Sequence, residues 1–157
     1  MFATTFYLDS PISLDRLAEA FATATDTSRE QVATITRADF ERSPRRWFSN
    51  GQAVGLQVRE EHGDFPFAVE FLAREHVTFP TVIGWIAREL GVTALTDKFG
   101  VDPSSDSMWT MVTPEGATTT VFVDNADAGD DEPDLVLDSA SRVIYEAQRR
   151  SPTIATF

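Results

Sequence analysis

The sequence predicts an α+β domain: a mainly antiparallel sheet of two hairpins plus flanking strands, with about three helices packed on one face. Two pairs of segments alternate apolar and polar residues on either side of a short turn, which is the pattern of a β-hairpin. Three other segments repeat apolar residues at helical spacing. No fixed-period repeat or long linker divides the chain, so we expect one domain over residues 1–150 and a tail over residues 151–157.

The chain begins with a strand, a helix and a second strand. Residues 2–8 are rich in aromatic and β-branched side chains, and Asp9-Ser10-Pro11 ends this strand. Ser13 can cap the helix that follows, whose apolar face consists of Leu14, Leu17, Ala18, Phe21 and Ala22. Residues 32–37 have the composition of a short strand.

The clearest element is a hairpin in the middle of the chain. Residues 54–59 alternate apolar side chains with small or polar ones, which predicts a half-buried strand. His62, Gly63 and Asp64 supply the turn, and the alternation then resumes with Phe67, Val69 and Phe71.

A second helix follows this hairpin. Pro80 lies near its predicted start and Gly91 just past its predicted end. We expect Trp85 at the edge of its buried stripe, which consists of Val82, Ile83, Ile86, Ala87 and Leu90. Residues 92–96 have the pattern of another short strand.

The last third of the chain predicts a second hairpin and a third helix. Residues 108–113 and 118–124 flank the turn sequence Pro114-Glu115-Gly116. Residues 135–150 have helical spacing, with Asp138 as the N-cap and an expected inward face of Val143, Ile144 and Ala147.

Charge is the most unusual bulk property. The formal net charge is -12, and the chain has no cysteine. Such acidity argues against nucleic acid and anionic membrane as partners, because both are bound through a surplus of Lys and Arg. No apolar run approaches the roughly 20 residues that span a bilayer, and the N-terminus lacks the pattern of a secretion signal. We therefore expect a cytoplasmic protein.

No motif predicts catalysis, a cofactor or a metal. The sequence has no Gly-x-Ser-x-Gly elbow and no glycine-rich phosphate-binding loop. An EF-hand starting at Asp124 would need ligands at positions where Ala126 and Ala128 stand. His62 and His76 each lack a recognisable set of further ligands. We expect no catalytic residue, no cofactor and no metal site.

The candidate site is therefore a surface for a protein partner. From residue 91 onward the chain has 12 acidic and four basic residues. The densest part holds six carboxylates within eleven residues: Asp124, Asp127, Asp130, Asp131, Glu132 and Asp134. Such a segment can steer a basic partner to the surface, whereas affinity requires a buried anchor nearby, for which Trp109 and Phe122 on the adjoining hairpin are the candidates, unless they belong to the core. A purely solvated loop is the alternative.

Two segments resemble small immunity proteins of bacterial polymorphic-toxin and contact-dependent inhibition systems. One is Phe-Tyr-Leu-Asp-Ser-Pro-Ile-Ser at residues 6–13, which leads into a helix. The other runs from Asp102-Pro103 through Met108 and the turn at residues 114–116 to a strand ending at Asp124. The resemblance implies a non-catalytic acidic inhibitor that occludes a cognate toxin, often a basic nuclease.

Two further functions remain open. The order of helices and strands, together with the acidity, also resembles secretion chaperones of the type III kind, which hold an effector as dimers. An enzyme that depends on a metal is the lesser alternative. The oligomeric state separates the first two functions, because a chaperone of this kind is an obligate dimer.

Overall fold

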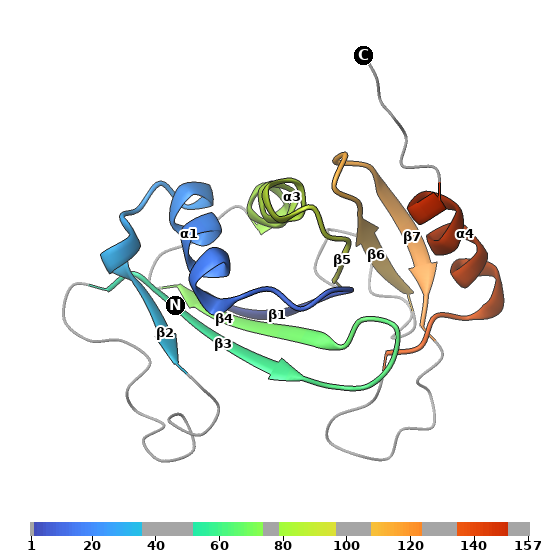
Figure 1. Ribbon diagram of the computed structural model, residues 1–157, viewed down its shortest axis with the longest axis horizontal. Coiled ribbons are helices and arrows are strands. Elements are labelled where there is room, and N and C mark those ends of the chain that lie inside the picture. The colour runs from blue at the N-terminus through green and yellow to red at the C-terminus, as the bar shows by residue number, and fades with distance from the viewer. Residues whose placement is uncertain (1, 36–51, 74–78, 97–107, 124–134, 151–157) are drawn as a thin grey trace.

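The structure, a computed structural model, describes residues 2–35, 52–73, 79–96, 108–123 and 135–150. They form a seven-stranded sheet and three α-helices, which confirms the α+β class (Figure 1). The helices are α1 (Leu14–Ala24), α3 (Phe79–Leu90) and α4 (Ser139–Arg150), and a 3-10 helix, η1 (Arg29–Gln31), precedes β2. The strands are β1 (Phe2–Leu8), β2 (Val32–Ile35), β3 (Val54–Glu60), β4 (Phe67–Ala73), β5 (Ala94–Thr96), β6 (Met108–Val112) and β7 (Thr118–Phe122).

The strand order is β2-β3-β4-β1-β5-β6-β7. β2 runs parallel to β3, and the other pairs are antiparallel. The predicted arrangement, two hairpins with strands flanking them, is not confirmed, because β1 and β5 lie between the β3–β4 and β6–β7 pairs. The pairing of β1 with β4 extends from Phe2↔Ala73 to Leu8↔Phe67. Such long-range pairing leaves no signal in local sequence patterns.

Two helices cover one face of the sheet. The Ser13 hydroxyl accepts a hydrogen bond from the Arg16 amide and caps α1, as its sequence predicts. Leu17 and Phe21 of α1 and Ile83 and Ile86 of α3 are fully buried in one core cluster with side chains of β1, β3 and β4. The buried stripe predicted for the second helix is therefore confirmed, and Trp85 is 39% exposed beside it.

α4 packs on the opposite face, at the other end of the sheet. Side chains of adjacent strand residues point to opposite faces. Ala94 belongs to the cluster beneath α1 and α3, whereas Leu95 belongs to a second cluster with Tyr145 of α4. Figure 1 shows α4 beyond β7, away from α1 and α3. The expectation that all helices pack on one face is therefore wrong.

The inward face predicted for the last helix is also wrong. Val143 is 63% exposed and Ile144 is 37% exposed, and Ala147 is exposed as well. The buried residues of α4 are Ser141 and Tyr145. Their hydroxyls bind groups of the sheet, so hydrogen bonding rather than apolar burial determines which side of this helix faces inward.

β3 departs from the predicted half-buried strand. Leu56 is buried beneath the helices, but Gly55 and Gln57, which point to the other face, are buried too. Alternation along the sequence therefore identified the strand but did not predict burial on both faces.

Candidate functional site

Of the residues predicted to bind a partner, the structure describes only the two aromatic candidates, Trp109 and Phe122. The six carboxylates from Asp124 to Asp134 lie outside the described residues, as do His76 and the tail at residues 151–157. Trp109 lies on β6, partly buried, and its ring contacts the Tyr7 ring edge-on at 5.7 Å between centroids. This contact places the tryptophan at the border of the second core cluster.

Both ends of the acidic segment are attached to the sheet. On one side Val123 forms an antiparallel bridge with Leu137, and on the other Leu135 forms a parallel bridge with Gly63. The chain therefore leaves β7 and returns to a neighbouring position. We call Phe122, Val123, Leu135 and Leu137 the stem. Phe122 is 41% exposed, whereas the other three are buried.

The Asp64 side chain binds the C-terminal part of the stem and α4. Its carboxylate accepts two hydrogen bonds from the Arg142 guanidinium, both at 2.9 Å, and one from the Leu137 amide at 2.9 Å. A bidentate pair of this kind is strong and directional. Asp64 was expected only as a turn residue, but it joins the β3–β4 turn to α4.

A second carboxylate, Asp9, joins three elements at the end of the sheet. Its Oδ1 accepts hydrogen bonds from the Thr93 amide at 3.1 Å and the Ser10 hydroxyl at 3.4 Å. Its Oδ2 accepts a hydrogen bond from the Tyr145 hydroxyl at 2.6 Å. The Arg149 guanidinium lies 5.6 Å from the centroid of the Tyr145 ring, a cation–π contact.

Burial and the neighbouring Asp9 carboxylate raise the pKa of Tyr145 above its usual value of about 10. A raised pKa in the folded state favours the neutral phenol. The contribution of neutral Tyr145 to the free energy of unfolding is therefore fully present below about pH 10, the pKa of an unfolded tyrosine. It is lost as the pH rises through the pKa of Tyr145 in the folded protein.

Tyr145→Phe is expected to lower the free energy of unfolding by about 1–3 kcal/mol, because it removes a hydrogen bond to a charged acceptor. Urea denaturation measures this loss. The chain has two tyrosines. In Tyr7→Phe the phenolate absorbance therefore reports Tyr145 alone, and we expect it to titrate above pH 10 or so. Titration at the ordinary value would contradict the Tyr145–Asp9 hydrogen bond.

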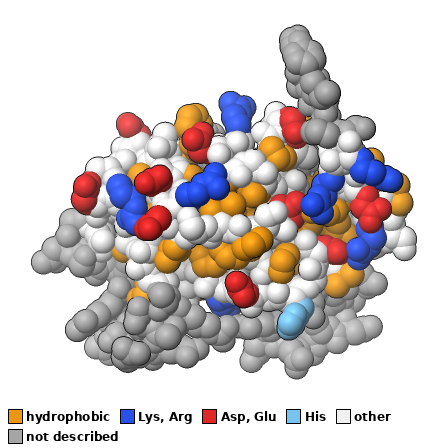
Figure 2. All heavy atoms as spheres, in the orientation of Figure 1, with side chains coloured by type: hydrophobic (Ala, Val, Ile, Leu, Met, Phe, Trp, Pro, Cys, Tyr) orange, Lys and Arg blue, Asp and Glu red, His pale blue; other side chains and the backbone are white. Residues whose placement is uncertain are grey.

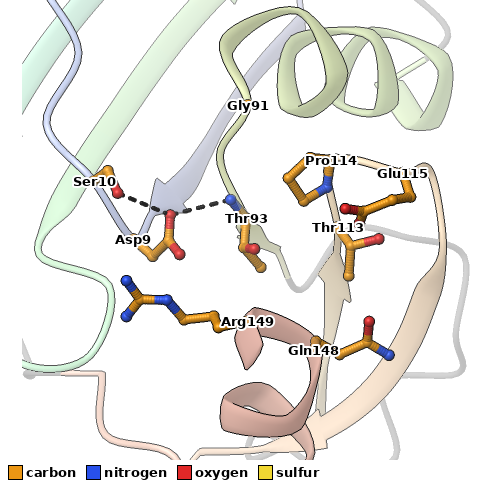
Figure 3. Close-up of a pocket in the computed structure, with 9 residues that line it drawn as sticks. All are labelled: Asp9, Ser10, Gly91, Thr93, Thr113, Pro114, Glu115, Gln148 and Arg149. Atoms are coloured by element: carbon orange, nitrogen blue, oxygen red, sulfur yellow. Dashed lines mark hydrogen bonds between the residues drawn. The ribbon is translucent and has the colours of Figure 1, made fainter. Parts of the chain in front are cut away.

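A polar pocket of about 330 Å³ lies beside Asp9 (Figure 3). Figure 3 shows side chains from the end of β1, the start of β5, the β6–β7 turn and the last turn of α4 around it. The lining residues are Asp9, Ser10, Gly91, Thr93, Thr113, Pro114, Glu115, Gln148 and Arg149. No pattern in the sequence predicted this pocket, because Asp9 is 84 residues from Thr93 and 136 from Tyr145.

The chemistry of the pocket comes from a small set of polar and charged side chains. Among the described residues, no group of three or more His, Asp or Glu side chains could hold a metal ion. His62 is exposed at the β3–β4 turn. The pocket offers one guanidinium, two carboxylates, hydroxyls and an amide, which suit binding by charge and hydrogen bonds.

Comparisons with known proteins identify no relative: no family model, curated protein or solved structure matches the chain. Within the described residues, no helix combines the length and apolar character needed to cross a membrane.

Proposed function

We propose that this chain is a non-catalytic protein-binding module, an immunity protein that binds and neutralises a cognate basic toxin, for which a nuclease is the expected class. The observation that supports the proposal most is the concentration of charge. Residues 91–157 have a net charge of -8 out of -12, with six carboxylates between Val123 and Leu135. A basic toxin surface complements such charge and associates faster because of it.

The stem supports this proposal in a second way. Because Val123 bridges Leu137 and Leu135 bridges Gly63 of the β3–β4 turn, the described residues on either side of the acidic segment are held to the fold. Phe122 lies at the start of that segment with 41% of its surface exposed. An exposed aromatic side chain beside concentrated charge combines apolar contact with electrostatic steering, the two contributions that a tight and fast complex uses.

Neutralising the acidic segment is expected to slow association with the toxin. The probe is the product of the gene immediately upstream. Asp127→Asn, Asp130→Asn and Asp131→Asn together should lower the association rate constant about tenfold at low salt, since steering raises rates by about 10–10³. The difference should shrink as salt rises. Stopped-flow mixing at several salt concentrations measures both effects.

A matched variant controls for the loss of three charges. Glu19, Glu30 and Glu89 are exposed, and within the described residues their carboxylates form no ion pair or hydrogen bond. Changing these three to glutamine removes the same net charge from α1, η1 and α3. If this variant slowed association as much as the Asp→Asn variant, the role assigned to residues 124–134 would be wrong. If the upstream product did not bind the native chain, the immunity function itself would be wrong.

One observation favours a second candidate function, an acidic secretion chaperone that binds its effector as a dimer. Val143, Ile144 and Ala147 form an exposed apolar strip on α4. Figure 2 shows hydrophobic side chains exposed among Lys and Arg at the right of the molecule, where Figure 1 places α4. Light scattering separates the candidates: a monomer at micromolar concentration excludes an obligate dimer.

A further inference from the structure

We propose that the pocket beside Asp9 binds a small zwitterion with a carboxylate and an ammonium group, the chemistry of a free amino acid. The inference is independent of the toxin-binding proposal, because the pocket shares no residue with the stem or the acidic segment. Its volume of about 330 Å³ falls at the lower end of the range for small-ligand sites, roughly 300–1,000 Å³.

Arg149 provides the site for the carboxylate. In the described part of the chain, no carboxylate forms an ion pair with its guanidinium. The Tyr145 ring holds the guanidinium in place through the cation–π contact. An arginine that is positioned in this way can bind a carboxylate with two parallel hydrogen bonds. Gln148, one residue earlier on α4, adds an amide to the same wall.

The opposite side of the pocket favours a positive group. Glu115 contributes a carboxylate from the β6–β7 turn, and within the described residues no cation pairs with it. Gly91 follows the last residue of α3, so the negative end of that helix dipole lies at the pocket. A simple anion would be repelled by Glu115 and Asp9, whereas a zwitterion presents an ammonium group to them.

A hydroxyl in the pocket wall also offers a hydrogen bond to a ligand. Thr93 lines the pocket and is only 6% exposed. Its amide binds Asp9, but its hydroxyl has no hydrogen-bond partner among the described residues. A threonine hydroxyl can both donate and accept a hydrogen bond, so it can bind either polar group of a ligand. Figure 3 shows the Thr93 side chain directed between Asp9 and Thr113, where a polar ligand could reach it.

The test titrates the intact chain with each of the 20 standard amino acids by isothermal calorimetry. At least one is expected to bind with a dissociation constant on the order of 0.1–1 mM, in keeping with the limited affinity that so few ligand atoms can supply. Its decarboxylated amine and its deaminated acid should each bind at least about tenfold more weakly. No heat of binding from any amino acid at 10-fold higher concentration, or equal binding of either half-molecule, would overturn the proposal.

Variants then locate the binding. Arg149→Met is expected to weaken binding of the amino acid found by calorimetry at least about tenfold, because the charge-assisted pair between the guanidinium and the ligand carboxylate is lost. Arg150→Met is the matched control, since Arg150 is the exposed neighbour on α4 and does not line the pocket. Thr93→Val keeps the shape of the side chain and should also weaken binding. If Arg150→Met weakened binding as much as Arg149→Met, the ligand would bind elsewhere. Melting temperatures without ligand show whether each variant folds.

Discussion

Replacing Gly63 by alanine is expected to lower the free energy of unfolding by about 2–5 kcal/mol, the sum of a strained backbone and a steric overlap. Gly63 has φ +102, a conformation that side chains of L-residues rarely adopt. A Cβ atom there would lie 2.6 Å from the Leu135 carbonyl oxygen. Because that atom is backbone, the overlap can be relieved only by moving the stem away from the β3–β4 turn.

Gly116→Ala is the control for this prediction. Gly116 also occupies a turn with positive φ, at +89, but a Cβ atom there would meet only the end of the Arg88 side chain, at 3.6 Å. Gly116→Ala therefore introduces backbone strain of the same kind without a steric overlap with another backbone segment. Urea denaturation of both variants gives the difference. Equal losses of stability would mean that the contact between Gly63 and Leu135 contributes nothing.

The Gly63 variant also has a local consequence. Displacing the stem separates the Leu137 amide from the Asp64 carboxylate that binds it. Hydrogen exchange of the Leu137 amide should then accelerate more than exchange in β1, which lies in the centre of the sheet. If both accelerated equally, the stem would unfold only with the whole domain.

Local patterns predicted the elements of this fold well. The strand at residues 2–8, the Ser13 cap and the buried stripe of α3 all follow from composition and spacing over a few residues. Strand order did not follow, because the pairing of β1 with β4 and β5 joins segments far apart in the chain. The sequence therefore predicted the kind of sheet but not the central position of β1.

The candidate site was harder to predict, for a physical reason. Apolar spacing on α4 predicted that Val143 and Ile144 face inward, whereas Ser141 and Tyr145 do so through hydrogen bonds to Phe122 and Asp9. In the sequence, a serine or tyrosine whose hydroxyl is bound inside the fold cannot be distinguished from an exposed one until its hydrogen-bond partner is known. The pocket could not be predicted for a similar reason, because its lining residues come from separate stretches of the chain that only the tertiary fold brings together.

The pocket and the acidic segment also make different demands on the fold. The segment requires only that its two ends be attached, because steering depends on charge over a Debye length, about 8–10 Å at moderate salt. The pocket requires side chains at defined positions. Of the two proposals, the pocket is therefore expected to be the more sensitive to substitutions that shift α4, such as those at Asp9 or Tyr145.

Phe21→Ala is expected to lower the free energy of unfolding by about 3–5 kcal/mol, because it empties a large volume in the core. The Phe21 ring is fully buried between α1 and the sheet. Its centroid lies 5.9 Å from that of Phe6 on β1 and 5.2 Å from that of Phe71 on β4. The substitution therefore removes contacts that join the helix to two central strands. Urea denaturation measures the loss.

Phe122→Ala controls for the change from phenylalanine to alanine itself. Phe122 is 41% exposed on β7, so its truncation should cost far less, about 1 kcal/mol or below, as for other partly exposed positions. A loss at Phe21 no larger than the loss at Phe122 would contradict the assignment of the three rings to the core. Because Phe122 adjoins the acidic segment and Phe21 does not, the pair also separates stability from binding. Phe122→Ala should speed dissociation of the toxin while leaving the fold nearly as stable, whereas Phe21→Leu, the milder core variant, should lower stability and leave dissociation unchanged.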